Sequence, residues 1–402
     1  MKKKLFLLAV LVQLASTAWC TEDVIQDTQV DSVSASKSQP RSEFNAGTDI
    51  GILERKKPLM SPPASDASDK DFKYWSQAVL SRVKVRAYAQ GGYTATFQNE
   101  GKNSNTFDLK RIVLMVGADI APHFYAFFMH EFKSGAVQEY YLEYRPFKAL
   151  NFRLGQSKNE LSIENPLSPT VLESISCSSQ SVAWLCGADP LVNNGSGRDL
   201  GIMMYGDLFN SKLHYVVEVV NGGQINTNDK NTQKNVIAKL EYKVLPTLKL
   251  SVSGQKGYGY AVATSPFNPG IKLGDTYRQN RYAAGFEWTG SRAGRDFWRN
   301  RCPYVRCEAL GGKDGDVGSF GVYGATTIPL YKQLDVVAVA DYFNKNTDMH
   351  LRQTNLTLGF QYWIHTKCRL QAQYAYSIKS HEMKALTGGN YSQILTQVQV
   401  SF

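Results

Sequence analysis

Apolar and polar side chains alternate along most of the chain after residue 80. In residues 81–92, SRVKVRAYAQGG, the cations Arg82, Lys84 and Arg86 alternate with small apolar residues. Successive side chains on a β-strand point to opposite faces, so this segment places three cations on one face and small apolar groups on the other. The alternation predicts a strand with one polar and one apolar face.

The same texture recurs in sixteen segments, which we predict to be strands. They lie at 82–98, 106–120, 123–133, 137–145, 149–158, 198–208, 212–221, 234–243, 247–257, 280–290, 303–311, 317–328, 332–343, 351–363, 367–378 and 391–402. Connections are mostly short after even-numbered strands and longer after odd-numbered ones, except at 291–302 and near residue 134. An even strand count with this rhythm is typical of outer-membrane barrels, and a sheet in lipid must close on itself. We therefore expect an all-β, 16-stranded antiparallel transmembrane β-barrel with short periplasmic turns and long external loops.

A soluble β-sandwich is the alternative, because it also has one apolar and one polar face. Two features favour the barrel. Tyr140, Leu142 and Tyr144 give the expected outer face residues suited to lipid and to an aromatic girdle, and the chain ends in the amphipathic strand YSQILTQVQVSF. A terminal aromatic strand is similar to the signal read by the bacterial barrel-assembly machinery, so Phe402 is the expected assembly signal.

The N-terminus has the order of a secretory signal. Three lysines precede an apolar run at 5–14 and small residues at 15–18, and the run is too short to span a bilayer. We predict a signal peptide at 1–20, cleaved after Ala18 or Cys20, and hence export to the outer membrane of a Gram-negative bacterium. Lipidation of Cys20 is the alternative, which bulky Trp19 disfavours.

Composition then divides the remaining chain. Residues 21–79 are rich in Ser, Asp, Gln, Lys and Pro without any period, which predicts a flexible polar tail, and residues 80–402 form the expected barrel. The net charge is +10, yet residues 21–72 hold ten acidic and six basic residues, so the positive excess belongs to the β-rich part. An exported protein rarely meets nucleic acid, so small anionic solutes, outer-membrane lipid and lipopolysaccharide are the expected partners.

If the apolar face meets lipid, the polar face lines the lumen. Rows of Arg and Lys concentrate anions in a narrow pore and are the usual device of anion or phosphate channels. The alternative is an ordinary wet face of mixed charge, as Glu241 beside Lys239 suggests. The expected pore-lining or anion-binding cations are Arg82, Lys84, Arg86, Arg145, Arg153, Lys158, Lys239, Lys243 and Lys249.

The longest connection is 159–197, and an insertion of this length without a period is usually functional or disordered. It follows the fifth strand, where porins fold a loop inward, so we expect it to narrow the lumen; a mobile external loop is the alternative. In an exported protein the close pair Cys177 and Cys186 predicts a disulfide that stiffens this loop. The pairing of Cys302, Cys307 and Cys368 stays open.

Signals of catalysis are weak. The six histidines lack metal-ligand spacing, and neither G-x-S-x-G nor H-E-x-x-H occurs. The stretch GGKDGD at 311–316 lacks the carboxylate that a calcium loop needs at the proper distance, so it predicts a tight hairpin. We expect no enzyme, no cofactor and no metal; an outer-membrane hydrolase with a Ser–His pair assembled by the fold is the alternative.

Two stretches carry a family resemblance: FDLKRIVLMVGADIAPHFYAFFMHEF (107–132) and YYLEYRPFKALNFRLGQSKNELSIE (140–164). They resemble the start of the phosphate-selective porin O/P family, with a basic and hydrophobic second strand, a short turn, and a fifth strand ending in Gly-Gln-x-Lys, here Gly155, Gln156 and Lys158. Asn159 and Glu160 stand where that family usually has Pro-Phe. The resemblance implies a homotrimer of sixteen-stranded barrels with cationic lumens, although phosphate specificity belongs to only part of the family.

Together these observations predict an outer-membrane porin for passive diffusion of small solutes that favours anions such as phosphate. A non-selective or sugar-taking porin is the first alternative, because the expected lumen side carries many Tyr, Gln and Asn residues. A surface-binding or adhesion barrel, with its long loops as the contact surface, is the alternative from another class.

Overall fold

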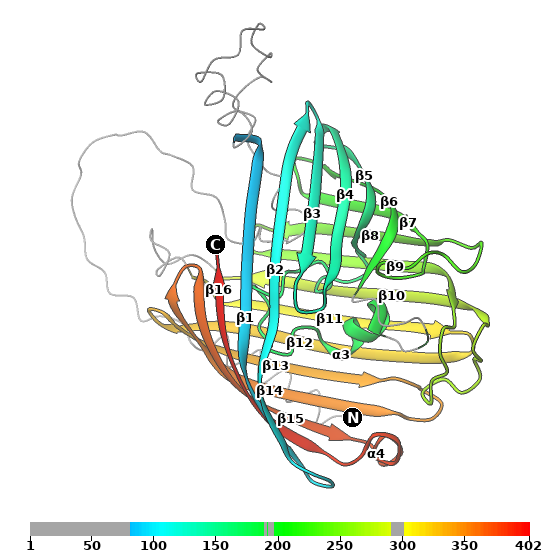
Figure 1. Ribbon diagram of the computed structural model, residues 1–402, viewed down its shortest axis with the longest axis vertical. Coiled ribbons are helices and arrows are strands. Elements are labelled where there is room, and N and C mark those ends of the chain that lie inside the picture. The colour runs from blue at the N-terminus through cyan, green and yellow to red at the C-terminus, as the bar shows by residue number, and fades with distance from the viewer. Residues whose placement is uncertain (1–80, 189–190, 192–196, 291–300) are drawn as a thin grey trace, which may run out of the picture. The chain divides into compact units, whose positions relative to one another are not determined.

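The chain folds into one closed antiparallel barrel in the computed structural model, which describes residues 81–188, 191, 197–290 and 301–402. Each strand pairs with its neighbours in sequence, and β1 pairs with β16 to close the sheet (Figure 1). The strands are β1 (Val83–Gln98), β2 (Ser104–Ala121), β3 (Phe124–Glu131), β4 (Ala136–Phe147), β5 (Leu150–Lys158), β6 (Arg198–Leu208), β7 (Leu213–Val220), β8 (Asn235–Leu245), β9 (Leu248–Tyr260), β10 (Thr276–Thr289), β11 (Tyr304–Asp314), β12 (Val317–Tyr331), β13 (Leu334–Asn344), β14 (Arg352–His365), β15 (Cys368–Lys379) and β16 (Tyr391–Ser401). The predicted 16-stranded antiparallel β-barrel is confirmed. The predicted signal peptide and polar tail lie outside the described residues.

The alternation of each strand assigns its two faces. In β8, Val236, Leu240 and Tyr242 point outward and are 45%, 48% and 45% exposed, whereas Ile237 and Lys239 point into the barrel and are 0% and 3% exposed. An apolar band on the outside of a closed barrel is the surface that strands present to lipid. No helix among the described residues is both long and apolar enough to cross a bilayer.

The two ends of the barrel differ in their connections. One end, which we name the turn end, has short links such as 122–123 and 246–247 together with the longer 290–303, and the other, the loop end, carries the long connections. The hairpin predicted at 311–316 closes at the loop end through Gly315 and Asp316, between β11 and β12. Gly315 has a φ of +60°, in the left-handed region that glycine adopts without cost.

Three short helical segments lie in the described connections between strands. These are α3 (Gln180–Ala183), η2 (Trp184–Ala188) and α4 (His381–Thr387). The Ser380 hydroxyl caps α4 by accepting a hydrogen bond of 3.2 Å from the Met383 backbone N–H. The first two belong to the connection between β5 and β6, which forms the centre of the candidate site.

Candidate pore

The third loop is the connection at 159–197, and its described part at 159–188 lies inside the barrel. Its backbone N–H groups bond to inward-facing side chains of distant strands: Ile163 donates to Glu308 on β11 (2.9 Å), Ile175 to Gln373 on β15 (2.9 Å), and Gln180 to Asp341 on β13 (2.8 Å). Side chains of the wall also reach the loop, as Gln399 on β16 donates to the Thr170 carbonyl at 3.3 Å. The expected inward fold of this loop is therefore what the structure has.

Two buried ion-pair clusters hold the third loop to the wall. Arg306 of β11 contacts Glu164 at 3.2 Å and Glu173 at 2.7 Å, and Lys239 of β8 contacts Glu160 at 2.9 Å. A buried charge is tolerated only when it is paired and hydrogen-bonded, so these contacts fix where the loop can lie. Burial raises the pKa of the Glu164 carboxyl, while the Arg306 charge and hydrogen bonds from Ser179 act in the opposite direction.

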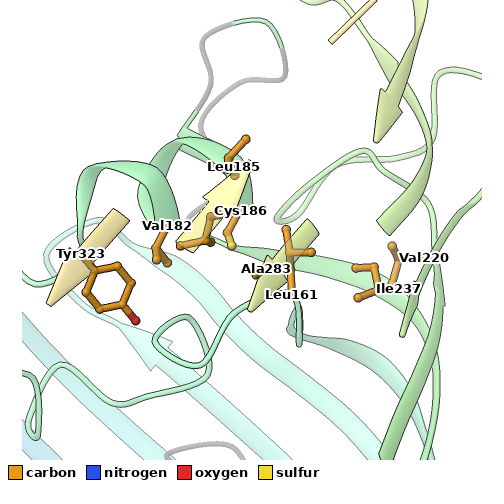
Figure 2. Close-up of a cluster of buried hydrophobic side chains, with 9 residues drawn as sticks. Leu161, Val182, Leu185, Cys186, Val220, Ile237, Ala283 and Tyr323 are labelled. Atoms are coloured by element: carbon orange, nitrogen blue, oxygen red, sulfur yellow. The ribbon is translucent and has the colours of Figure 1, made fainter. Parts of the chain in front are cut away.

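An apolar contact accompanies the ionic ones. Figure 2 shows side chains of the third loop meeting side chains of the inner wall at the level of α3 and η2. Cation–π contact adds to this site, since the Lys345 ammonium lies 4.7 Å from the Trp184 ring centroid. The cluster joins Leu161, Val182, Leu185 and Cys186 of the loop to Val220, Ile237, Ala283, Leu310 and Tyr323 of the wall.

The predicted disulfide between Cys177 and Cys186 is wrong, since the structure has both as buried free thiols. The reason is that the loop spreads across the lumen between them. Cys177 lies against Arg111 of β2, whereas Cys186 packs with the cluster on β7, β8 and β10. Burial raises the pKa of the Cys186 thiol, which leaves it protonated.

Most of the predicted lumen cations are paired. Arg145 and Arg153 both contact Glu143, Arg153 at 2.7 Å, and each guanidinium also lies over a tyrosine ring. Lys239 contacts Glu241 as well as Glu160, and Lys249 contacts Glu241 and Glu287. Lys158 donates to the carbonyl oxygens of Asn165 (2.8 Å) and Leu167 (2.6 Å), so it stabilises the start of the third loop.

The row on the first strand lies near the turn end. Lys84 and Arg86 face the lumen and are half-buried, opposite Gly117 and Met115 of β2, and Arg82 lies just before the strand. Asp119 lies close enough to Lys84 to offset part of its charge. Lys243 is exposed near the turn end of β8, on the inward-facing row of that strand. The structure thus brings the predicted cations into one lumen but not into one group.

The inner face of β1–β4 carries an apolar cluster beside its charged residues, which the alternation did not predict. Tyr125, Phe127 and Met129 of β3 are each 3% exposed and point inward, whereas Phe128 points outward and is 40% exposed. The buried cluster is completed by Tyr88, Val113, Met115 and Tyr141. The lumen therefore has an apolar cluster on β1–β4 among charged side chains.

Several charged residues of the site were absent from the predicted pore-lining set, chiefly Arg198, Arg281, Arg306 and Arg369. Arg198 contacts Glu139 at 3.0 Å, Arg281 contacts Asp314 at 2.6 Å, and Arg369 donates to the Leu172 carbonyl at 3.2 Å. Their strands show the same alternation as β1, so their inward orientation could have been found. Their partners lie far away in sequence and could not.

Other candidate chemistry is sparse. No cluster of His, Cys, Asp and Glu that could bind a metal occurs within the part of the chain that the structure describes.

Phe402, the expected assembly signal, lies beside β1. Its backbone N–H donates to the Ala87 carbonyl at 2.9 Å, and its side chain is 69% exposed.

Comparison with solved structures identifies the fold. The anion-selective porin from Comamonas acidovorans is 11% identical, with a TM-score of 0.57 over 80% of this chain and 99% of its own. OprB of Pseudomonas putida is 9% identical, with a TM-score of 0.58 over 83% and 96%, and a trimer form of OmpT of Vibrio cholerae is 10% identical, with a TM-score of 0.52 over 80% and 100%. No protein-family model matches the sequence, and no curated protein does. At these identities the likeness shows a porin fold.

Proposed function

We propose that this protein is an outer-membrane porin through which small solutes diffuse passively. The observation that carries the proposal is the closed barrel of β1–β16 with an apolar outer face and a loop folded into its lumen. A closed sheet satisfies every backbone hydrogen bond within lipid, and an inward loop narrows the path to a selective constriction. The likeness to solved porins supports the same conclusion.

The proposed location is the outer membrane of a Gram-negative bacterium, with the turn end in the periplasm and the loop end outside. The signal-like residues 1–20 support export, and the terminal Phe402 supports recognition by the barrel-assembly machinery. We further propose a homotrimer, which agrees with the trimer form of OmpT among the similar structures.

The preferred solutes are small anions such as phosphate. Ion pairs cancel much of the field from Arg153, Lys239 and Lys249. The preference is therefore tested on the β1 row near the turn end, where three cations alternate with apolar residues. Phosphate itself is suggested by the resemblance to the phosphate-selective porin O/P family. The sugar-taking alternative was based on polar side chains such as Gln on the lumen side. It loses support, because the amides of Gln371 and Gln373 both donate to the Glu173 carbonyl of the third loop rather than facing a solute.

Planar-bilayer recordings test this function. Purified protein should form channels whose reversal potential in a salt gradient indicates a preference for anions. Replacing Arg82, Lys84 and Arg86 together by Gln should lower the anion-to-cation permeability ratio at low salt. The effect should shrink in concentrated salt, because the screening length falls to about 3 Å at 1 M.

A matched control removes the same charge elsewhere. The substitutions K256Q, R278Q and K313Q change three cations on the outer face at the loop end, and the permeability ratio should stay at its wild-type value. A wild-type ratio in the R82Q/K84Q/R86Q variant would refute the anion preference. A folded, heat-modifiable barrel without any conductance would refute the porin.

A further inference from the structure

Four cations gather on the outer face of the barrel at the loop end. Lys256 of β9 lies opposite Asn280 of β10, which lies opposite Lys313 of β11, so the two lysines share one row across three strands. Arg278 lies two residues nearer the loop end on β10, and Lys234 directly precedes β8. All four side chains are exposed. We name Lys234, Lys256, Arg278 and Lys313 the outer basic belt.

The register places this belt on the outer face. Lys256 pairs with Val236, which is 45% exposed on the apolar side of β8, and Arg278 lies on the same face of β10 as Tyr282, which is 57% exposed. Side chains two residues apart on a strand share a face, so neither cation points into the lumen. These charges therefore do not line the proposed solute path.

Few carboxylates neutralise the belt. Lys234 pairs with Asp229, but across the residues that the structure describes no carboxylate forms an ion pair with Lys256, Arg278 or Lys313. Neighbouring strands are about 4.8 Å apart, so Lys256 and Lys313 lie about 10 Å apart, within reach of one multiply charged anion. A belt of like charges at the edge of an apolar surface favours an anionic partner that also has an apolar part.

The surface below the belt suits such a partner. Val236 and Val252 are 45% and 52% exposed there, and a groove of about 690 Å³ on the outside of β4–β7 reaches Lys234. The groove is lined mainly by Tyr140, Leu142, Leu154, Ile202 and Val219. Gly155 lets β5 approach β4 closely beside the groove, because a Cβ atom there would lie 2.3 Å from the Tyr140 carbonyl oxygen.

We infer that the outer basic belt binds the phosphates of a phosphorylated glycolipid in the outer leaflet, and that the groove holds one of its acyl chains. The cations lie on the face turned to lipid, immediately above the apolar band. The headgroup of a lipid whose acyl chains contact that band lies at the same level as the cations. This inference rests on the proposed outer-membrane location, but it concerns a surface separate from the lumen.

Thermal unfolding with defined lipids tests the inference. Protein purified in an uncharged detergent is heated with bisphosphorylated lipid A, with dephosphorylated lipid A, or with inorganic phosphate, and the loss of the compact gel form is followed. Ligand that binds only folded protein raises the unfolding midpoint. We expect bisphosphorylated lipid A alone to raise it, and the K256Q/R278Q/K313Q variant to lose about a hundredfold in apparent affinity, since each basic residue near an anionic lipid contributes roughly fivefold.

The control variant K148Q/K212Q/K367Q removes three exposed lysines at the turn end and should keep the wild-type response. Equal stabilisation of the belt variant, or equal stabilisation of wild type by dephosphorylated lipid A or by inorganic phosphate, would overturn the inference. So would a change in oligomeric state of the belt variant with unchanged lipid A affinity, because the surface would then contact a second copy. Conductance of the same samples separates the two proposals: a lipid A response without conductance would refute the porin and keep the belt.

Discussion

Replacing Arg306 by Gln should loosen the third loop from the wall of the barrel. Arg306 is 1% exposed and contacts two loop carboxylates, Glu164 at 3.2 Å and Glu173 at 2.7 Å. Both carboxylates are themselves buried, at 3% and 4% exposed. The neutral amide would leave them facing each other without a cation.

The magnitude follows from this burial. Removing one partner of a buried ion pair costs about 3–5 kcal/mol, because the other charge stays desolvated. Converted to an equilibrium, this disfavours the docked loop by roughly a hundredfold to several thousandfold, since each 1.4 kcal/mol is a factor of ten. The Ser179 hydroxyl, which donates to Glu164 at 2.9 Å, and the separate contact of Lys239 with Glu160 at 2.9 Å reduce the net effect.

Single-channel recording measures the outcome. A loop that leaves the wall should raise open-channel noise and change the mean conductance. The matched control is Lys249→Gln, since Lys249 contacts Glu241 at 3.1 Å and also Glu287, both on the wall, and its removal leaves the contacts of Arg306 with the loop intact. Wild-type noise and conductance in a folded R306Q barrel, or the same change in K249Q, would refute the reasoning.

Two further predictions concern the same loop. Burial raises the pKa of Glu164 above its ordinary value of 4.5, so between pH 4.5 and the raised pKa the docked loop holds a proton that an undocked loop has lost. Docking should therefore strengthen as pH falls through this window and weaken as pH rises. Open-channel noise should fall on acidification in wild type but not in E164Q, and rising noise in wild type would contradict this. Cys177 and Cys186 should both be alkylated in denatured, unreduced protein and a reducing agent should leave conductance unchanged, so a disulfide-linked peptide in mass spectrometry would contradict the structure.

The strands could be predicted because a barrel wall in lipid requires apolar and polar side chains to alternate along every strand. Where the alternation stops, the predicted strand ends are wrong: β10 begins at Thr276 rather than at residue 280. The extra residues put Thr276 and Arg278 on the outer face, and polar side chains there end the apolar alternation although the backbone ladder continues. Beyond the apolar band the pattern no longer indicates the strand.

The faces of β2–β4 show a second limit. Residues 124–129 read FYAFFM, so both faces of β3 are apolar and hydrophobicity alone does not say which one meets the lumen. Register decides it: Tyr125 lies opposite Glu143 of β4, whose carboxylate is fully buried, and this places Phe127 inside with it. The inward position of the apolar residues of β3 could therefore be inferred only through the neighbouring strand.

A lumen cation contributes to anion preference through the charge that its partners leave uncancelled. Arg153 and Lys84 have equal charge, but Arg153 is 3% exposed beside Glu143, whereas Lys84 is half-buried with Asp119 as a nearby carboxylate. Because a close ion pair has a weak field at a distance, we expect Arg153 to act mainly on the wall that holds it, and Lys84 to act more on solutes in the proposed pore. Alternation placed both residues in the lumen, but the division of roles follows from pairings such as Arg306 with Glu164, which lie 142 positions apart. If the proposed anion preference holds, it will depend as much on how the carboxylates are distributed as on the rows of cations.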